Sequence, residues 1–421
     1  MTDLLELADR LWRGAVDTTQ VHPFSHFNEL AEPAAGTGFV ASFANVSALR
    51  TDDGLVLVDT GSALLSGSAH DTIRRWTGDP VHTVVFTHGH IDHCFGVERY
   101  DADNAERGAP PPVVVAHEAV ADRFDRYRAT IGYNTVINRR QFSLAGGQFV
   151  WPEEYRYPDR TYRDRLDLDV GGERVELHHA RGETDDHTWA WVPARGVLFS
   201  GDLFIWASPN CGNPQKVQRY PGDWAAALRT MAALGATTLL PGHGLPVVGS
   251  DRVRQALTDT AALLEHLLGA TLELMNAGAP LDEIIHTVRA PADLLERPYL
   301  RPVYDEPEFV VRNVWRLYGG WYDGNPSRLK PAPDRDVAAE VAALAGGPGR
   351  LAERALELAD AGDLRLAAQV VEWAALAAPA DRVVQRARAD VYERRVADAT
   401  STMAKGVFGW AARESRAASD D

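Results

Sequence analysis

The sequence has little cysteine, no long apolar run and fewer basic than acidic residues. Only Cys94 and Cys211 occur in 421 residues, which excludes a disulfide framework and is typical of a reducing compartment. No stretch approaches the roughly 18 uncharged apolar residues that a membrane helix requires. The acidic N-terminus lacks the basic and apolar segments of a signal peptide. These absences predict a cytoplasmic protein with no membrane partner.

The charge balance narrows the possible partners further. The chain carries 43 Lys and Arg against 59 Asp and Glu, a formal net charge of −16. Nucleic-acid phosphates need clustered basic side chains, so this balance argues against a nucleic-acid partner. An anionic substrate would need a local basic patch. With 45% hydrophobic and 24% charged residues, the chain can build a core of ordinary size.

The pattern of the sequence changes near residue 250. Before it, short β-rich runs alternate with helical stretches, which predicts a layered α/β domain over residues 1–250. After it, apolar residues recur with helical spacing, so an all-α domain is expected over residues 251–421. The β-rich runs are Gly38–Phe43, Leu55–Asp59, Val81–Thr87, Arg174–His179 and Gly196–Ser200; the clearest helical stretches are Asp71–Trp76, Trp224–Leu234, Asp251–Asn276 and residues 337–400, with a break at Asp360–Asp363.

A cluster of histidines directly follows one of the β-rich runs. The segment Thr87-His-Gly-His-Ile-Asp-His93 places three imidazoles and a carboxylate within six residues. Imidazole nitrogen and carboxylate oxygen are ligands that Zn²⁺ favours. His88 and His90 can point to one metal while Asp92 and His93 reach a second. The segment therefore predicts a two-metal site.

A two-metal site needs more ligands, and they should lie at the ends of later strands. Three candidates meet this demand. Glu183 follows the run Arg174–His179, Asp202 follows Gly196–Ser200, and His243 follows a short apolar run. His187, four residues after Glu183, is expected to hydrogen-bond a ligand, although it could itself be an alternative ligand.

In order and spacing, these residues resemble the metallo-β-lactamase family. Its signature is His-x-His-x-Asp-His, a later ligand, a bridging Gly-Asp and a Gly-His; the strand-end Asp59 matches the family's early aspartate. Over about residues 35–250, the resemblance implies an αββα sandwich with two metals along one edge and a metal-bridging hydroxide as the reactive group. It assigns one metal to His88, His90 and Glu183, the other to Asp92, His93 and His243, and the bridge to Asp202, with Asp92 and Asp202 as catalytic carboxylates.

A narrower resemblance is to the alkyl sulfatases of the dodecyl-sulfate-hydrolase type. They carry a glutamate where most relatives have histidine, as here at Glu183, 19 residues before Asp202. The segment Gly320-Trp-Tyr-Asp-Gly-Asn-Pro326 also resembles a motif of their helical dimerisation domain. The resemblance implies a homodimer formed through the C-terminal helical region. It does not extend to that family's C-terminal sterol-carrier-like domain. It implies three sulfate contacts: Asn210, Arg316 and Tyr322.

The expected activity is hydrolysis of a small anionic ester, a sulfate ester above all, with two Zn²⁺ ions as cofactors. A guanidinium such as that of Arg316 suits sulfate because its fork matches two oxygens and never loses its charge. One alternative keeps the site and changes the substrate to another ester, a lactone, a thioester or a phosphoester. A second is a di-iron oxygenase, because Glu183 makes the site richer in oxygen ligands and so suits iron.

Overall fold

The chain forms two compact units, each described here by itself. The computed structural model describes residues 3–144 and 149–420; positions 1, 2, 145–148 and 421, which the predicted domain ranges include, lie outside the described residues. The first unit comprises Met1–Ile131 and Pro152–Gly319, and the second Gly132–Trp151 and Gly320–Asp421. The predicted division of the sequence after residue 250 stays a prediction.

The first unit contains a seven-stranded sheet in the order β1-β2-β3-β4-β5-β6-β7. Strands β1 to β4 pair antiparallel, whereas β4 to β7 pair parallel. The carboxyl ends of the parallel strands therefore share one edge of the sheet. The strands are β1 (Glu29–Ala34), β2 (Thr37–Ala41), β3 (Val46–Thr51), β4 (Gly54–Val58), β5 (Val81–Val85), β6 (Val113–His117) and β7 (Arg160–Tyr162).

A second sheet of six strands, in the order β13-β12-β11-β10-β9-β8, completes the sandwich. Only β11 and β12 pair parallel; the other neighbours are antiparallel. Its strands are β8 (Arg165–Val170), β9 (Glu173–His179), β10 (Thr188–Val192), β11 (Val197–Ile205), β12 (Thr238–His243) and β13 (Val247–Val248).

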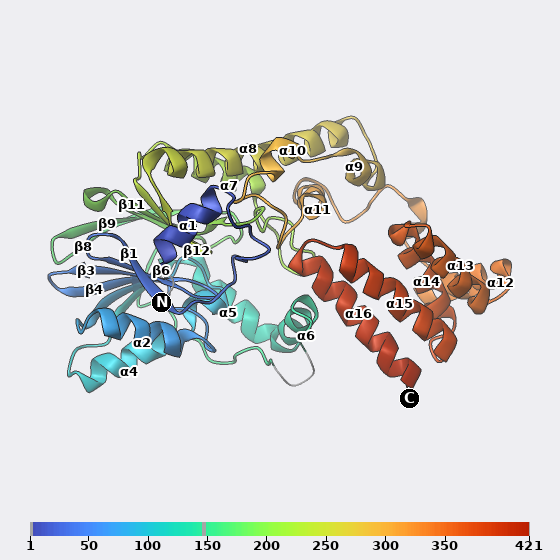
Figure 1. Cartoon of the computed structure of the whole chain (residues 1–421), viewed down its shortest axis with the longest axis horizontal. Coiled ribbons are helices and arrows are strands. Elements are labelled where there is room, and N and C mark those ends of the chain that lie inside the picture. Colours follow the sequence, from blue (N-terminus) through green and yellow to red (C-terminus); the bar gives the residue numbers. More distant parts are fainter. Residues whose placement is uncertain (1–2, 145–148, 421) are drawn as a thin grey trace. The chain divides into compact units, whose positions relative to one another are not determined.

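The two sheets bury an apolar core between them, and helices cover their outer faces (Figure 1). Val56 and Val85 from the first sheet and Leu177 and Phe199 from the second are at most 1% exposed. Helices α2 and α4 pack on the first sheet, and α7 and α8 on the second. This confirms the predicted αββα sandwich. The helices of this unit are α1 (Leu4–Trp12), α2 (Ser66–Trp76), α3 (Ile91–Cys94), α4 (Val97–Glu106), α5 (Ala119–Ala129), α7 (Pro221–Ala232), α8 (Ser250–Asn276), α9 (Leu281–Thr287), α10 (Ala292–Leu295) and α11 (Pro307–Tyr318), with the 3₁₀ helix η1 (Pro193–Arg195).

The second unit is helical, as predicted for the C-terminal region. Leu351, Ala355, Val371 and Val384 meet in a core of their own. The predicted helix break falls between α13 and α14, where the side chain of Asp363 accepts a hydrogen bond from Leu366 N–H and so caps the new helix. The elements are α6 (Ile131–Gln141), η2 (Pro326–Arg328), α12 (Asp334–Ala345), α13 (Pro348–Asp360), α14 (Leu364–Ala377), α15 (Arg382–Asp398) and α16 (Thr402–Asp420).

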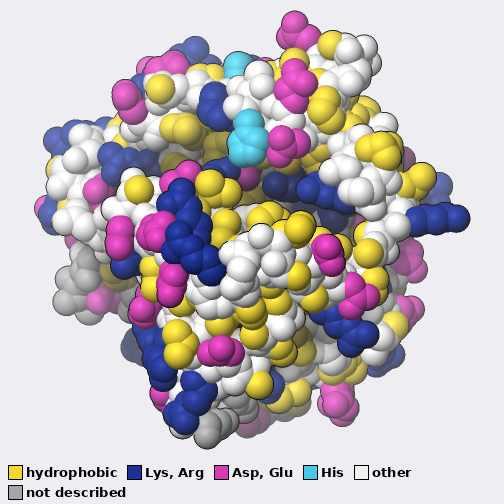
Figure 2. All heavy atoms as spheres, turned by 90° about the vertical axis from the view of Figure 1, so that its right-hand side faces the viewer, with side chains coloured by type: hydrophobic (Ala, Val, Ile, Leu, Met, Phe, Trp, Pro, Cys, Tyr) yellow, Lys and Arg dark blue, Asp and Glu magenta, His cyan; other side chains and the backbone are white. Residues whose placement is uncertain are grey.

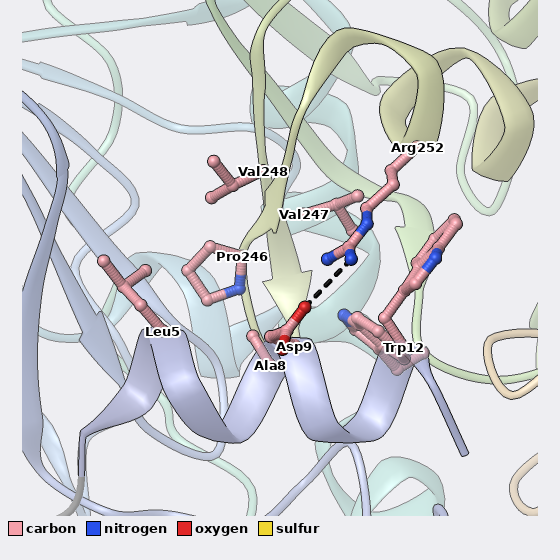
Figure 3. A pocket seen from close by; sticks show the side chains of 9 residues that line it. Leu5, Ala8, Asp9, Trp12, Pro246, Val247, Val248 and Arg252 are labelled. Carbon is pink, nitrogen blue, oxygen red and sulfur yellow. Dashed lines mark hydrogen bonds and ion pairs between the residues drawn. The ribbon is translucent and has the colours of Figure 1, made fainter. Parts of the chain in front are cut away.

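The surface carries mixed charge. On the face shown in Figure 2, scattered groups of Lys and Arg and of Asp and Glu side chains lie among hydrophobic and uncharged surface. Within the described ranges, no helix is both long and apolar enough to cross a bilayer. A hollow of about 250 Å³ in the first unit is lined by Trp12, Trp206 and Val247, and the ion pair between Asp9 and Arg252 lies at its side (Figure 3).

Candidate metal centre

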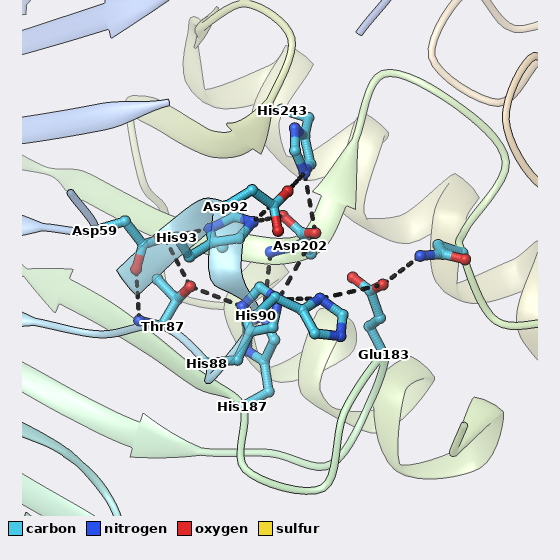
Figure 4. A network of polar contacts seen from close by, with 12 residues as sticks. Asp59, Thr87, His88, His90, Asp92, His93, Glu183, His187, Asp202 and His243 are labelled. Atoms are coloured by element: carbon cyan, nitrogen blue, oxygen red, sulfur yellow. Dashed lines mark hydrogen bonds and ion pairs between the residues drawn. The ribbon is translucent and has the colours of Figure 1, made fainter. Parts of the chain in front are cut away.

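Six of the seven predicted ligands follow a strand or end one, whereas Asp202 lies inside β11, which continues to Ile205 beyond the predicted end at Ser200. Four follow β5, two in the loop and two in the short helix α3. The other three lie in the loop between β9 and β10, within β11, and at the last residue of β12. The structure brings all seven together in two groups, and within each group the candidate ligand atoms lie within 4.8 Å of one another (Figure 4). The first group is His88, His90, Glu183 and Asp202; the second group is Asp92, His93 and His243.

Hydrogen bonds to Asp59 fix the protons on two of the histidines. Asp59 Oδ2 lies 2.7 Å from His93 Nδ1 and 2.7 Å from Thr87 Oγ1. A carboxylate only accepts, so His93 Nδ1 and the Thr87 hydroxyl both donate to it. The Thr87 oxygen can then accept from His88 Nδ1, 3.0 Å away. Both imidazoles therefore keep a lone pair on Nε2, the state that a metal ligand needs.

His243 has the same arrangement, with a main-chain oxygen in place of the carboxylate. Its Nδ1 donates to the carbonyl of Phe43. Its Nε2 then faces carboxylate oxygens of Asp92 and Asp202 at 3.5 and 3.3 Å. Lone pairs that face carboxylates repel unless a cation lies between them, so this geometry fits a bound metal.

The first group shows the same need for a cation. His88 Nε2 lies 2.8 Å from His90 Nδ1, so two imidazole nitrogens converge on one point. Glu183 Oε2, Asp202 Oδ1 and His93 Nε2 are buried without a hydrogen-bond partner among the described residues. Buried polar atoms are rarely left without partners. Imidazole nitrogens and carboxylates are the donor set that Zn²⁺ and iron share, and the residues present therefore fit two divalent ions.

Asp202 contacts members of both groups. Its Oδ1 lies 3.4 Å from His93 Nε2 and its Oδ2 lies 3.9 Å from His88 Nε2. Although burial acts to raise it, the pKa of Asp202 is held well below its usual range by His243 and His93 when these rings carry a positive charge. A Cβ at Gly242 would lie 2.1 Å from Asp202 Oδ1, so only glycine leaves room for the carboxylate there. This position between the groups suits a bridging role.

The pKa of Glu183 is shifted in the opposite direction to that of Asp202. Burial, and then the charge of Asp202, raise the pKa of Glu183 well above its ordinary value. Asn210 Nδ2 donates to Glu183 Oε1, and Arg219 donates to the main-chain oxygen of Glu183. Both contacts hold the side chain in place. A cation beside it would favour the ionised form that a ligand needs.

His187 holds the main chain of Asp202, the residue between the two groups. Its Nε2 accepts a hydrogen bond of 3.1 Å from the main-chain N–H of Asp202, and its ring stacks on that of His88 at 4.9 Å. Burial lowers the pKa of His187 to about 3, so the ring is neutral. Because this contact uses the Nε2 lone pair, it favours the predicted outer role over the alternative of a metal ligand.

The three predicted sulfate contacts lie in different surroundings. Asn210 reaches the first group through Glu183. Arg316 is exposed, and its Nε donates to Gln218 Oε1 at 3.0 Å. Tyr322 belongs to the second unit and is 38% exposed. All three assignments stay predictions.

A buried ion pair behind the histidine loop was not foreseen from the sequence. Asp186 Oδ2 accepts from Gly89 N–H at 3.0 Å and from Arg123 Nε at 2.7 Å. Arg123 comes from α5 and its side chain is 2% exposed. The pair fixes the backbone between His88 and His90. The only sequence signal was that Asp186 adjoins His187.

Two family models match the chain. The Metallo-beta-lactamase superfamily model matches residues 40–243. The Alkyl sulfatase dimerisation model matches residues 280–418. The first range contains all seven candidate ligands, and the second contains the motif at residues 320–326.

Curated relatives and solved structures agree with these matches. A linear primary-alkylsulfatase of Pseudomonas sp. (strain ATCC 19151) is 26% identical over 82% of this chain and 69% of its own length. An (R)-specific secondary-alkylsulfatase of Pseudomonas sp. is 28% identical over 83% of this chain and 57% of its own length. The structure of the stereoselective inverting sec-alkylsulfatase Pisa1 from Pseudomonas sp. is similar with a TM-score of 0.81 at 25% identity, over 92% of this chain and 65% of that one. The chain thus spans only part of each relative.

Proposed function

Because residues 40–243 match the Metallo-beta-lactamase superfamily model and residues 280–418 match the Alkyl sulfatase dimerisation model, we propose that the protein is a metal-dependent hydrolase of sulfate esters. The observation that carries this proposal is the presence, in one chain, of two ligand groups with a glutamate in the first. The relatives named above are alkyl sulfatases, which supports the sulfate ester as the substrate class.

We propose that two Zn²⁺ ions occupy the two groups. Ions held there would lower the pKa of a water between them and polarise an oxygen of the substrate. The protein's own contribution is to fix the ligands. Asp59 and the Phe43 carbonyl keep His93 and His243 in the tautomer that leaves a lone pair on Nε2.

The exposure of the ligands indicates where the substrate approaches. The side chains of Asp92 and His90 are 23% and 17% exposed, whereas those of the other five ligands are at most 5% exposed. Solvent and substrate therefore reach the centre past Asp92 and His90. If water attacks the carbon of the ester, the leaving group is sulfate, a weak base, and the main demand on the site is to stabilise its charge. Attack on sulfur would instead release an alkoxide that has to be protonated.

Sulfate release tests this proposal. We expect zinc-loaded protein to release sulfate from at least one class in a panel of short, long, secondary and aryl sulfate esters. Asp202→Ala, which removes the residue between the groups, should lower the rate by at least about 10³-fold, since a buried group that acts in the chemical step is lost. No release from any sulfate ester, together with turnover of a lactone, thioester or phosphoester, would replace this substrate class by the alternative one.

One observation favours a second candidate, a di-iron oxygenase. Two of the four ligands of the first group, Glu183 and Asp202, are carboxylates, and oxygen-rich sites with open positions suit iron. Oxygen consumption by iron-loaded protein, with no sulfate release by the zinc-loaded form, would establish this function.

We also propose a homodimer formed through the helical region and a cytoplasmic location. The family description of residues 280–418 supports dimerisation, and large apolar side chains such as Leu344 and Trp321 of the second unit are 82% and 72% exposed. The location is supported by Cys94 and Cys211, which are both buried and unpaired. Light scattering at micromolar concentration should give the mass of two chains.

A further inference from the structure

We propose that the ion pair of Asp186 with Arg123 positions the ligands of the first group, so that metal binding there depends on Asp186 while metal binding at the second group does not. The inference rests on the proposed function only in that both need a metal at the first group. Asp186 acts through the main chain of Gly89 rather than through a metal, so it is a positioning residue.

A short segment, which begins with Glu183 and ends with His187, holds two other parts of the chain in place. Asp186 Oδ2 accepts a hydrogen bond of 3.0 Å from Gly89 N–H, and Gly89 lies between two histidine ligands of the first group. His187 Nε2 accepts one of 3.1 Å from the main-chain N–H of Asp202. Because Glu183 is itself a candidate ligand, this one segment sets the distances among all four ligands of the first group.

The contact at Gly89 leaves the histidine loop little room to move. A Cβ at Gly89 would lie 2.8 Å from Arg123 Cδ and 3.0 Å from Asp186 Oδ2. The loop therefore lies directly against the ion pair and against helix α5, which carries Arg123. Protein interiors are close-packed and transmit strain. A change in the ion pair would thus move the main chain that positions both imidazoles of the first group.

The ion pair itself is buried. Arg123 Nε donates to Asp186 Oδ2 at 2.7 Å, and the two side chains are 2% and 0% exposed. Burial acts to raise the pKa of Asp186, but the charge of Arg123 and the hydrogen bonds to the carboxylate hold that pKa below its ordinary value. The ionised carboxylate therefore gives Gly89 N–H a charge-assisted hydrogen bond. Removal of either partner would leave the other charge buried without compensation, so the contact needs both residues.

The second group is held by other contacts. His93 Nδ1 donates to Asp59, and His243 Nδ1 donates to the carbonyl of Phe43. The main-chain oxygen of His93 accepts from Thr60 N–H at 2.8 Å and from the Thr60 hydroxyl at 3.0 Å. These anchors come from the first sheet and the loops that follow its strands, not from α5 or the segment that contains Asp186. The second group should therefore keep its geometry when the ion pair is lost.

Metal binding at each group separately tests the inference without any turnover. His243→Ala removes a ligand of the second group and His90→Ala removes one of the first, so each background reports on the other group. Co²⁺ is the probe, because its visible absorption shows ligand geometry as well as occupancy, and competition with a chelator gives its affinity. We expect Asp186→Asn to weaken Co²⁺ binding by about 10- to 100-fold in the His243→Ala background, with an altered spectrum, and by less than about threefold in the His90→Ala background.

Asp185→Asn is the matched control. Asp185 also accepts a hydrogen bond from Arg123, but its side chain is 39% exposed. The substitution therefore removes a negative charge from the same guanidinium without removing the acceptor of Gly89 N–H, and Co²⁺ affinity should stay within about threefold in both backgrounds. If Asp186→Asn does not fold, the double variant Arg123→Gln/Asp186→Asn takes its place, because it buries no charge and still lacks the charged acceptor.

Three outcomes would overturn the inference. Asp186→Asn could leave Co²⁺ binding at the first group unchanged. It could weaken both groups equally, which would make the ion pair a general support of the fold. Asp185→Asn could be equally damaging, which would make the charge near Arg123 the cause rather than the contact with Gly89. An Asp186-dependent affinity of the first group in a chain that hydrolyses no sulfate ester would uphold the inference and reject the proposed function, so the two failures are distinguishable.

Discussion

The two ligand groups have similar donors but very different surroundings. The first group lies among charged and amide side chains, namely Arg219, Asn210 and the pair of Arg123 with Asp186 behind its loop. The second group lies against aromatic rings: Phe24 lies 4.6 Å from the ring of His243, edge to face, and Phe43 lies 5.7 Å from it. One side of the centre is therefore polar and the other apolar.

This difference indicates how an amphipathic ester would be oriented. A charged sulfate group gains from the donors beside the first group, whereas an alkyl or aryl group gains from removal of apolar surface against the rings beside the second. Phe24 also stacks on Phe43 at 4.9 Å and meets Tyr304 edge to face at 4.4 Å. The orientation would place the ester bond between the two groups. Each of the following changes affects one side more than the other.

Asp59→Asn should have the largest effect and should weaken both groups. Asp59 holds His93 directly and His88 through the Thr87 hydroxyl. An amide offers one acceptor oxygen instead of two, so His93 can adopt the wrong tautomer and lose its Nε2 lone pair. Loss of such a partner lowers metal affinity by about 10- to 100-fold. Competition with a chelator, followed by measurement of metal per chain, should show the second group affected most.

Thr87→Val is the matched control for that change. It removes the hydroxyl that accepts from His88 and leaves the contact between Asp59 and His93 in place. We expect weaker binding at the first group alone, with one metal per chain retained at chelator concentrations that empty it. Equal loss of both metals in Thr87→Val would show that the two groups do not depend on separate hydrogen bonds.

Asp305 should impose a pH dependence on the stability of the polar side. Burial raises the pKa of Asp305 to about 7, although its carboxylate accepts from Gly212 and Glu306 N–H. The ordinary pKa of an aspartate is 3.8, so between pH 4 and 7 the folded state holds a proton that the unfolded state releases. The free energy of unfolding should therefore fall as pH rises from 4 to 7, by up to about 1.4 kcal/mol per pH unit.

Denaturant unfolding at pH 5, 6 and 7 measures this slope. Asp305→Asn cannot ionise, so its slope should be less steep than that of the unaltered chain. Its stability at pH 5 should also be lower, because Asn offers a single acceptor oxygen to two N–H donors. Parallel slopes in the two proteins would show that Asp305 is not protonated in the fold near neutral pH.

The sequence was informative where a signal is local and poor where it depends on burial. The ligand residues could be proposed because they follow β-rich runs, and the structure brings all seven together. Strand β5 nevertheless ends at Val85, two residues before the predicted end, because Thr87 N–H donates to Asp59 rather than to a neighbouring strand. The αββα sandwich and the C-terminal helical region were both predicted correctly. The alternation of strands with helices, and the helical spacing of apolar residues, extend over long stretches of the sequence.

The groups around the ligands could not be predicted in the same way. Arg123 and Asp186 lie 63 residues apart and meet only because α5 packs beside the histidine loop. Arg219 and Arg316 look alike in a sequence, yet one is buried beside Glu183 and the other is exposed. Nothing in the order of residues distinguishes them. Tertiary packing decides which arginine is buried, and therefore which positive charge lies beside the ligands.

Phe24→Ala should have the smallest effect and should appear only with apolar substrates. Phe24 is partly exposed, so its loss removes ring surface from the side of His243 without opening the core. An aromatic contact contributes about 0.5–1.5 kcal/mol beyond area burial, so KM for a long-chain or aryl sulfate should rise about three- to tenfold while kcat changes little. KM for a short-chain ester should stay the same. Equal increases in KM for short and long esters would mean that Phe24 supports His243 rather than contacting the substrate. The organic group of the ester would then bind elsewhere, and the proposed orientation would rest on the polar side of the centre alone.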